Sequence, residues 1–148
     1  MKEVSHHVLY FKEILVTGGY NNTLVNLNTV EAYDHVPNKW TYMPDMIEER
    51  FSHESVAIKN KLFVFDDSLE VYDSVSDKFA LLKVPLKYST EYLSDSYKVI
   101  SIKNKIAVFP FSSNIVLLYD VNSNEWSQES CEVTGNISEF SCLKVPQF

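Results

Sequence analysis

The sequence has little of what marks several classes of protein. Its 148 residues include only 3 glycines and 5 prolines, too few for a collagen-like or low-complexity chain. Its apolar runs, such as Ile14–Val16 and Ile115–Leu118, fall far short of the ~20 residues that a membrane helix needs. The residues after Met1 form neither an apolar segment nor a small-residue cleavage site, so we expect no signal peptide. These absences predict a cytoplasmic protein that does not enter a membrane.

Basic charge and cysteine are also scarce. The formal net charge of -7 argues against binding to nucleic acid, which selects for clustered lysine and arginine. The acidic residues are scattered, so we interpret Asp66-Asp67 as a solvated turn rather than a paired carboxylate. Cys131 and Cys142 are expected to be reduced thiols, and a disulfide between them is the alternative.

What the chain does contain is apolar and aromatic residues, at 45% and 14%, enough to exclude a disordered chain and to build a core. Short runs of β-branched and aromatic residues alternate with turn residues, which is typical of β-strands, and helix is poorly supported. The expected strands are Ser5–Phe11, Ile14–Thr17, Thr29–Asp34, Lys39–Met43, Ser52–Lys59, Leu62–Phe65, Glu70–Asp73, Lys78–Leu82, Tyr97–Lys103, Ile106–Phe109, Ile115–Asp120, Glu125–Gln128 and a lone Phe140–Val145.

The strands recur in units with a common register. The strand after the first polar turn of each unit begins at Ile14, Leu62 and Ile106, at intervals of 48 and 44 residues. Each unit also has a Tyr-Asp pair, with a large aromatic residue seven positions after the tyrosine. These residues are Tyr33-Asp34 with Trp40, Tyr72-Asp73 with Phe79, and Tyr119-Asp120 with Trp126. A period of about 40–50 residues with four short strands per unit indicates a propeller built from blades.

The three units resemble the kelch repeat, in which an apolar strand ends in a glycine doublet and is followed by a loop, a Tyr-Asp strand and a spaced tryptophan. The first unit matches most closely, with Gly18-Gly19 at the doublet and Arg50 where the family often places an arginine before the next blade. The second and third units have Asp66-Asp67 and Phe109-Pro110 in place of the glycines.

The resemblance implies an all-β fold, a kelch-type β-propeller of about three four-stranded blades plus a lone final strand. The domain would cover residues 5–145, with blades at about 5–43, 52–83 and 97–128 and a stray inner strand at 140–145. Propellers typically close with ~4–8 blades, so we expect an incomplete propeller. Missing blades or an upstream BTB domain would then belong to a fuller chain, and closure by oligomerisation is the alternative.

The same resemblance implies a structural role for the repeated aromatic residues. A single blade cannot bury its own faces, so large aromatic side chains are expected to pack between neighbouring blades as core. The residues concerned are Tyr33, Trp40, Tyr72, Phe79, Tyr119 and Trp126.

Nothing in the sequence predicts catalysis. His6 and His7 are neighbours on an expected strand and point to opposite faces, a poor arrangement for one metal ion. His35 lies in a turn, and His53 lies at the start of an inner strand. No zinc, P-loop or nucleophile spacing is found. We expect no enzyme activity, no metal and no cofactor.

Kelch domains bind proteins through loops at one end of the blades, which implies a protein-binding module here. Within these loops Arg50 and His53 are candidates for binding a polar or acidic motif, because arginine makes bidentate contacts with carboxylates. The alternative for Arg50 is a surface ion pair with Glu48 or Glu49. The candidate aromatic anchors are Tyr20, Tyr88 and Tyr92.

Two roles of kelch domains then compete. The first is substrate recognition in a kelch-like adaptor for a cullin-type ubiquitin ligase, whose partner is a protein destined for degradation. The second is an actin-binding scaffold associated with the cytoskeleton. A kelch-type sugar-modifying enzyme ranks lower, because the metal cluster and secretion of such oxidases are not seen in this sequence.

Overall fold

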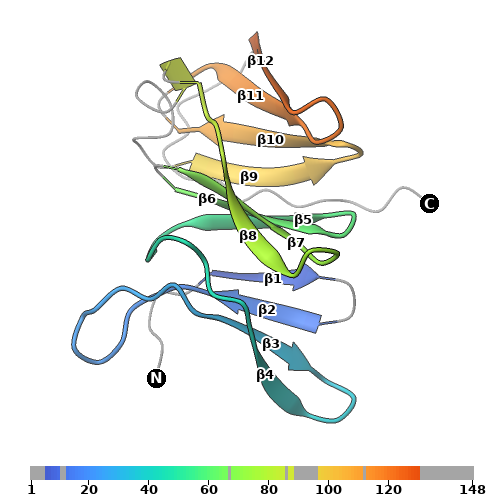
Figure 1. The fold of residues 1–148 in the computed structure, drawn as a ribbon. Coiled ribbons are helices and arrows are strands. Elements are labelled where there is room, and N and C mark those ends of the chain that lie inside the picture. The colour runs from blue at the N-terminus through green and yellow to red at the C-terminus, as the bar shows by residue number, and fades with distance from the viewer. Residues whose placement is uncertain are drawn as a thin grey trace. The chain divides into compact units, whose positions relative to one another are not determined.

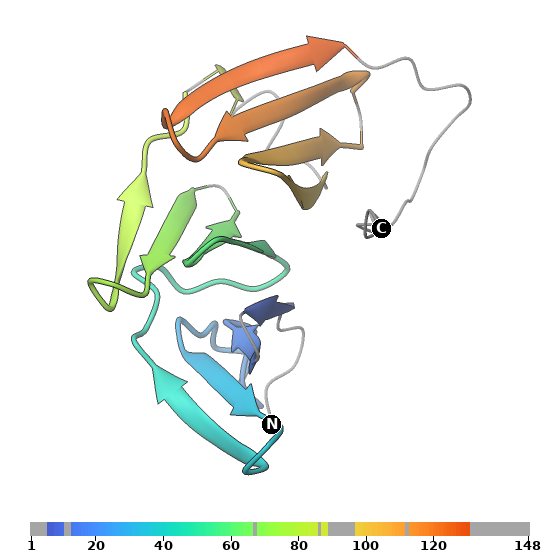
Figure 2. The same cartoon turned by 90° about the vertical axis from the view of Figure 1, so that its right-hand side faces the viewer.

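The computed structural model contains three antiparallel sheets, each of four strands (Figures 1 and 2). The structure describes residues 6–10, 13–66, 68–85, 87–88, 97–111 and 113–130. The first sheet is β1 (His6–Tyr10), β2 (Glu13–Thr17), β3 (Val30–Asp34) and β4 (Lys39–Met43). The second is β5 (Glu54–Ile58), β6 (Lys61–Phe65), β7 (Leu69–Asp73) and β8 (Lys78–Leu82). The third is β9 (Tyr97–Ile102), β10 (Lys105–Pro110), β11 (Ile115–Asp120) and β12 (Glu125–Ser130).

In every sheet the strands lie in chain order as a meander. The predicted all-β fold and its four-stranded units are therefore confirmed, with strand bounds that shift by a residue or two. The expected strand Phe140–Val145 and both cysteines lie outside the described residues. No helix in the described part of the chain is long and apolar enough to cross a membrane.

The chain divides into two compact units, Met1–Lys83 and Val84–Phe148. The first unit holds the first two sheets, and the second holds the third sheet. The predicted extent of a single domain, 5–145, stays a prediction.

The Tyr-Asp pair builds the same turn in each sheet, between its third and fourth strands. In the second sheet the Asp73 carboxylate accepts a hydrogen bond from the Val75 backbone N–H at 2.8 Å. The Tyr72 hydroxyl then donates to Asp77 Oδ1 at 2.8 Å, and Asp77 has a φ of 53°. Asp and Asn tolerate this left-handed conformation better than most residues, which explains why the turn ends on one of them.

The first and third sheets repeat this turn. The Tyr33 and Tyr119 hydroxyls donate to Asn38 and Asn124 at 2.9 and 2.8 Å. Both asparagines have positive φ, 53° and 58°. The aromatic residue seven positions after each tyrosine pairs with it across the strands, with ring centroids 5.0, 5.2 and 5.2 Å apart in the three sheets. The repeat recognised in the sequence is therefore a repeated hairpin with a stacked aromatic pair.

The core of the first unit lies between its two sheets. β1 and β5 lie side by side, and one face of the first sheet packs on one face of the second. The Tyr10 ring meets the Tyr72 ring edge-on at 6.3 Å, and the Tyr10 hydroxyl donates to the Asn60 carbonyl at 2.6 Å. The buried cluster consists of Tyr10, Leu15, Val30, Ala32 and Met46 from the first sheet and its outgoing loop, with Leu62, Val64 and Tyr72 from the second sheet.

The repeated aromatic residues differ in burial. Tyr72 and Tyr119 are buried, as expected for core positions, and Phe79 and Trp126 are half-buried. Trp40 is 50% exposed, so the prediction that it is core is wrong in this structure. The reason is that the second sheet packs on the face of the first sheet that carries Tyr10 and Leu15, whereas Trp40 lies on the opposite face. The same location leaves Tyr33 only half-buried.

Candidate protein-binding loops

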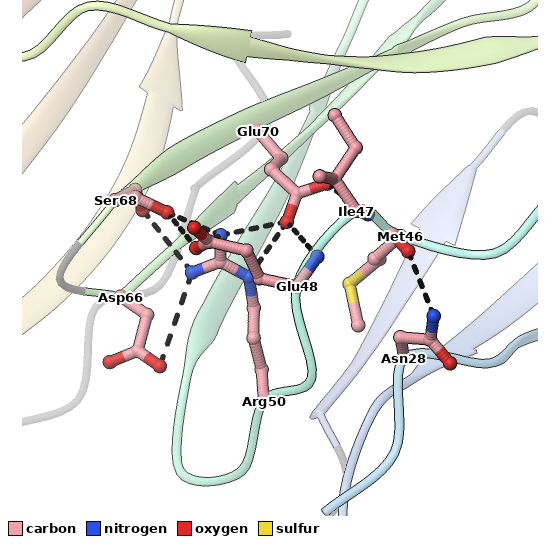
Figure 3. Close-up of polar contacts among 8 residues, drawn as sticks. All are labelled: Asn28, Met46, Ile47, Glu48, Arg50, Asp66, Ser68 and Glu70. Carbon is pink, nitrogen blue, oxygen red and sulfur yellow. Dashed lines mark hydrogen bonds and ion pairs between the residues drawn. The ribbon is translucent and has the colours of Figure 1, made fainter.

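Two loops at one end of the first sheet form a joint surface, which we call the loop platform, residues 18–29 and 44–53. The Gly19 N–H donates to the Arg50 carbonyl at 2.7 Å, and the Arg50 N–H donates to the Leu27 carbonyl at 3.0 Å. The backbone and the side-chain amide of Asn28 bond to the Met46 backbone at 2.8 and 3.1 Å (Figure 3). These bonds join residues 18 to 31 positions apart in sequence (46−28 and 50−19) and hold the two loops in one arrangement.

Gly18 makes the close contact between the two loops possible. Its φ is +54°, and a Cβ atom added there would lie 2.5 Å from the Arg50 carbonyl oxygen and 2.8 Å from His53 Cε1. Only glycine fits both the backbone conformation and the space. The glycine doublet thus allows a sharp bend and a close approach of the two backbones.

The tip of the first loop is closed by Asn21. Its side-chain oxygen accepts hydrogen bonds from the Thr23 N–H at 2.9 Å, the Thr23 hydroxyl at 2.7 Å and the Val25 N–H at 3.1 Å. This turn places Leu24 and Val25 at the surface, 77% and 50% exposed. The loop therefore presents two apolar side chains on a hydrogen-bonded base.

Arg50 lies in the second loop and points into the protein, where it contacts the second sheet (Figure 3). Its side chain is 2% exposed, and its Nε and Nη2 donate to Glu70 Oε1 at 3.2 and 2.8 Å. Further donors reach the Ser68 carbonyl and hydroxyl at 3.3 and 2.6 Å, and Nη2 lies 2.9 Å from Glu48 Oε2. The Ser68 hydroxyl also bonds to Glu48.

Glu70 completes this group, which we call the Arg50–Glu70 clasp. It is fully buried on β7, and its two oxygens also accept the backbone N–H groups of Ile47 and Glu48 at 2.7 and 3.0 Å. One carboxylate therefore fixes both the side chain and the backbone of the outgoing loop. A buried charge pair with all of these donors in place meets the conditions under which burial of charge is tolerated.

The candidates Arg50 and His53 are thus both buried, each 2% exposed. His53 Nε2 lies 2.7 Å from the Thr17 hydroxyl, at the end of β2. In this structure the arginine charge is engaged by Glu70 and Glu48, and neither residue is presented at the surface. Their contribution to binding stays a prediction, and the geometry favours positioning of the platform. The expected alternative partner Glu48 does contact Arg50, but the buried partner Glu70 was missed.

A sequence signal for Glu70 existed. Glu70 stands two positions before Tyr72 on the same strand, so both side chains lie on one face. An acidic residue on the same face as an interblade tyrosine needs a buried cation, and Arg50 is the chain's single arginine.

The surface that the platform offers is apolar and acidic. Leu24 and Val25 are exposed on the first loop, and Ile47 and Phe51 are 51% and 49% exposed on the second. Asp45, Glu48 and Glu49 of the second loop are exposed as well.

The aromatic candidates are distributed over both units. Tyr20 is half-buried, and its backbone pairs with Asn26 within the first loop. Tyr88 belongs to the second unit, where its ring lies 5.9 Å from that of Trp126. Tyr92 lies outside the described residues.

The described residues contain no cluster of three or more histidine, cysteine or acidic side chains suited to a metal ion. His35 is exposed in the turn between β3 and β4, and the side chains of His6 and His7 are not among those described.

Comparison with known proteins identifies the repeat. The family profile described as "Kelch motif" matches residues 12–47, which hold β2, β3, β4 and the first platform loop. The first sheet carries a kelch motif. Among solved structures, that of YjhT is similar to this chain, with a TM-score of 0.67 and 11% sequence identity. The match covers 91% of this chain and 54% of the YjhT chain, so this chain spans about half the length of the YjhT chain. No curated protein matches the sequence.

Proposed function

We propose that this kelch domain is a non-catalytic protein-binding module whose ligand docks on the loop platform. The observation that carries the proposal is the exposure of four large apolar side chains on two loops that hydrogen bonds and the Arg50–Glu70 clasp hold in place. Apolar side chains exposed on a rigid base lose little entropy on binding, which is what a binding site for a peptide requires.

The chemistry of the platform specifies the ligand. Its exposed charges are carboxylates, since the positive charge of Arg50 is buried. Charge complementarity therefore favours a peptide with apolar anchors flanked by lysine or arginine. This differs from the acidic motif that Arg50 suggested in the sequence.

Within this proposal, substrate recognition for a cullin-type ubiquitin ligase is the first reading and actin binding the second. Both rest on the kelch resemblance, and they differ in ligand. Co-sedimentation with actin filaments separates them, because an actin-binding module would pellet with filaments and an adaptor would remain in the supernatant.

The platform itself is tested by panning a random peptide library on the full chain. We expect the selected peptides to combine large apolar residues with lysine or arginine. Leu24→Asp and Phe51→Asp should abolish their binding, because each places a charge among the apolar anchors.

Val75→Asp is the matched control. Val75 is 84% exposed in the turn between β7 and β8, away from the platform, so its substitution should leave binding unchanged. Equal loss of binding in all three variants, or selection of acidic peptides, would contradict the proposed site.

A further inference from the structure

Leu24, in the first loop of the platform, has a left-handed backbone conformation with a φ of 58°. Its N–H donates to the Asn21 carbonyl at 2.9 Å, and the Asn21 N–H donates to the Val25 carbonyl at 3.1 Å. These bonds form a hairpin turn followed by one left-handed residue, a position that glycine usually fills. Leucine is strained there, because in this conformation the Cβ atom lies too close to the following carbonyl oxygen.

The other left-handed positions in the described part of the chain carry polar residues. Seven residues other than glycine have a positive φ there, and Leu24 is the one apolar member. The other six are Asn38, Ser52, Lys59, Asp77, Lys103 and Asn124. Asn124 has the same φ of 58°, and its side chain has a role in the fold, since it accepts the Tyr119 hydroxyl at 2.8 Å. Asparagine tolerates this conformation better than leucine does, so the turn itself does not account for Leu24.

The core of the first unit does not account for Leu24 either. Its side chain is 77% exposed and buries little area against the protein. The turn is held by the Asn21 side-chain oxygen, which accepts the Thr23 and Val25 N–H groups and uses no atom of the leucine side chain. Exposed apolar side chains are common and need no explanation by themselves. An exposed one on a strained backbone lowers stability without a compensating contact, which is the usual sign of a functional constraint.

We propose that Leu24 is the specificity-determining anchor of the loop platform, a leucine that serves ligand binding and lowers the stability of the free protein. This inference rests on the proposed function and assigns the central contact within it. The peptide ligand buries Leu24 between its own large apolar side chains, while its lysine or arginine residues contact the exposed carboxylates of the second loop. Because hydrogen bonds already hold the turn in one conformation, the anchor loses little backbone freedom on binding.

The test compares the full chain with three variants, Leu24→Asn, Leu24→Met and Val25→Asn. Circular dichroism gives the melting temperature of each protein without peptide. A random peptide library is panned in parallel on the full chain and on Leu24→Asn. The most enriched peptide from the full chain is then synthesised with a fluorescent label and titrated with all four proteins.

Leu24→Asn should raise the melting temperature by about 2–5 °C, because asparagine relieves the backbone strain. The same variant should bind the peptide about 10–100-fold more weakly, the fold-change expected for burial of one leucine side chain. Leu24→Met keeps a large unbranched apolar side chain and should retain most of the binding. Val25→Asn is the matched control, because Val25 is the next residue and is 50% exposed but does not have a positive φ. It should not raise the melting temperature, and it should weaken binding less than Leu24→Asn does.

A lower melting temperature in Leu24→Asn would overturn the inference, because the fold would then require the leucine. Equal loss of binding in Leu24→Asn and Val25→Asn would overturn it as well, since Leu24 would not be the main anchor. If both panned proteins select the same peptides with equal affinity, the inference fails but the proposed function stands, because the platform binds peptides without Leu24. If neither protein selects a peptide, the proposed function and this inference fail together.

Discussion

Replacing Glu70 by glutamine should lower the free energy of unfolding of the first unit by much more than a surface substitution does. The change keeps the size and shape of the side chain but removes the negative charge that faces the Arg50 guanidinium at 2.8 Å. It also replaces one of the two oxygens that accept the Ile47 and Glu48 N–H groups with an NH₂ group, which cannot accept. The buried arginine would retain Glu48, which is 48% exposed, and the Ser68 contacts.

The magnitude follows from the burial of both partners, 2% for Arg50 and 0% for Glu70. Removing one member of a buried ion pair costs about 3–5 kcal/mol, because the other charge is left desolvated. A domain's total stability is about 5–15 kcal/mol, so this loss is a large part of it. In a unit of this size it corresponds to a drop in melting temperature of about 12 °C or more.

Urea unfolding followed by circular dichroism measures this loss, with Lys61→Met as the matched control. Lys61 forms an ion pair with Asp73 at 3.6 Å on the same sheet, but the two side chains are 40% and 32% exposed. An exposed pair of this kind is worth about 0–1 kcal/mol. Each variant breaks one ion pair made by a side chain of the second sheet. The difference between their losses in unfolding free energy therefore measures the effect of burying the pair.

A loss in Glu70→Gln no larger than that in Lys61→Met would refute the buried clasp. The double variant Arg50→Met with Glu70→Leu gives a second check. Because it removes both charges together, it should be more stable than either single substitution. If the double variant is the least stable of the three, the clasp is not acting as a charge pair.

Three further predictions concern the platform and the core. Gly18→Ala should lower the free energy of unfolding by about 1–3 kcal/mol, because the added Cβ would overlap the Arg50 carbonyl oxygen at a φ of +54°. Ser52→Ala is the control, because Ser52 has a φ of 52° but lies at the surface, and it should change stability little. Equal effects of the two substitutions would contradict the close approach. Tyr72→Ala should cost about 3–5 kcal/mol and Tyr33→Ala clearly less, because the same repeat position is buried in the second sheet and half-buried in the first. Burial raises the pKa of Tyr10, Tyr72 and Tyr119, so these groups hold their protons to higher pH when folded, and stability should fall as pH rises above about 10. The tyrosine absorbance at 295 nm should therefore rise at higher pH in the folded chain than in the urea-unfolded chain.

The fold could be predicted because its signals are local. A two-residue period, a turn with Asp or Asn at its end and an aromatic residue seven positions after a tyrosine are all encoded within one hairpin. Each hairpin then repeats at a near-constant interval, so the strands of all three sheets could be assigned from composition and spacing. Exposure of Trp40 was missed for a different reason, because burial depends on what lies against a sheet and not on the sheet itself.

The environment of Arg50 could not be read from neighbouring residues. Its sequence neighbours Glu48 and Glu49 suggested a surface ion pair, but its buried partner Glu70 lies 20 residues away on another sheet. The identity of that partner depends on which face of β7 meets the first sheet. That face is set by Tyr72, whose ring packs on Tyr10, and Glu70 shares it because strand side chains alternate.

The choice of the correct neighbouring sheet explains why a charge pair lies in an interface that apolar residues would fill more simply. Apolar faces on repeated sheets are chemically alike, so any sheet can pack on any other, and aromatic pairs do not distinguish the correct neighbour. One glutamate on the face and one arginine in the preceding loop do distinguish it, because a wrong pairing leaves a buried charge unpaired. In this chain the device is present at Glu70 and absent at the equivalent Leu117, two positions before Tyr119.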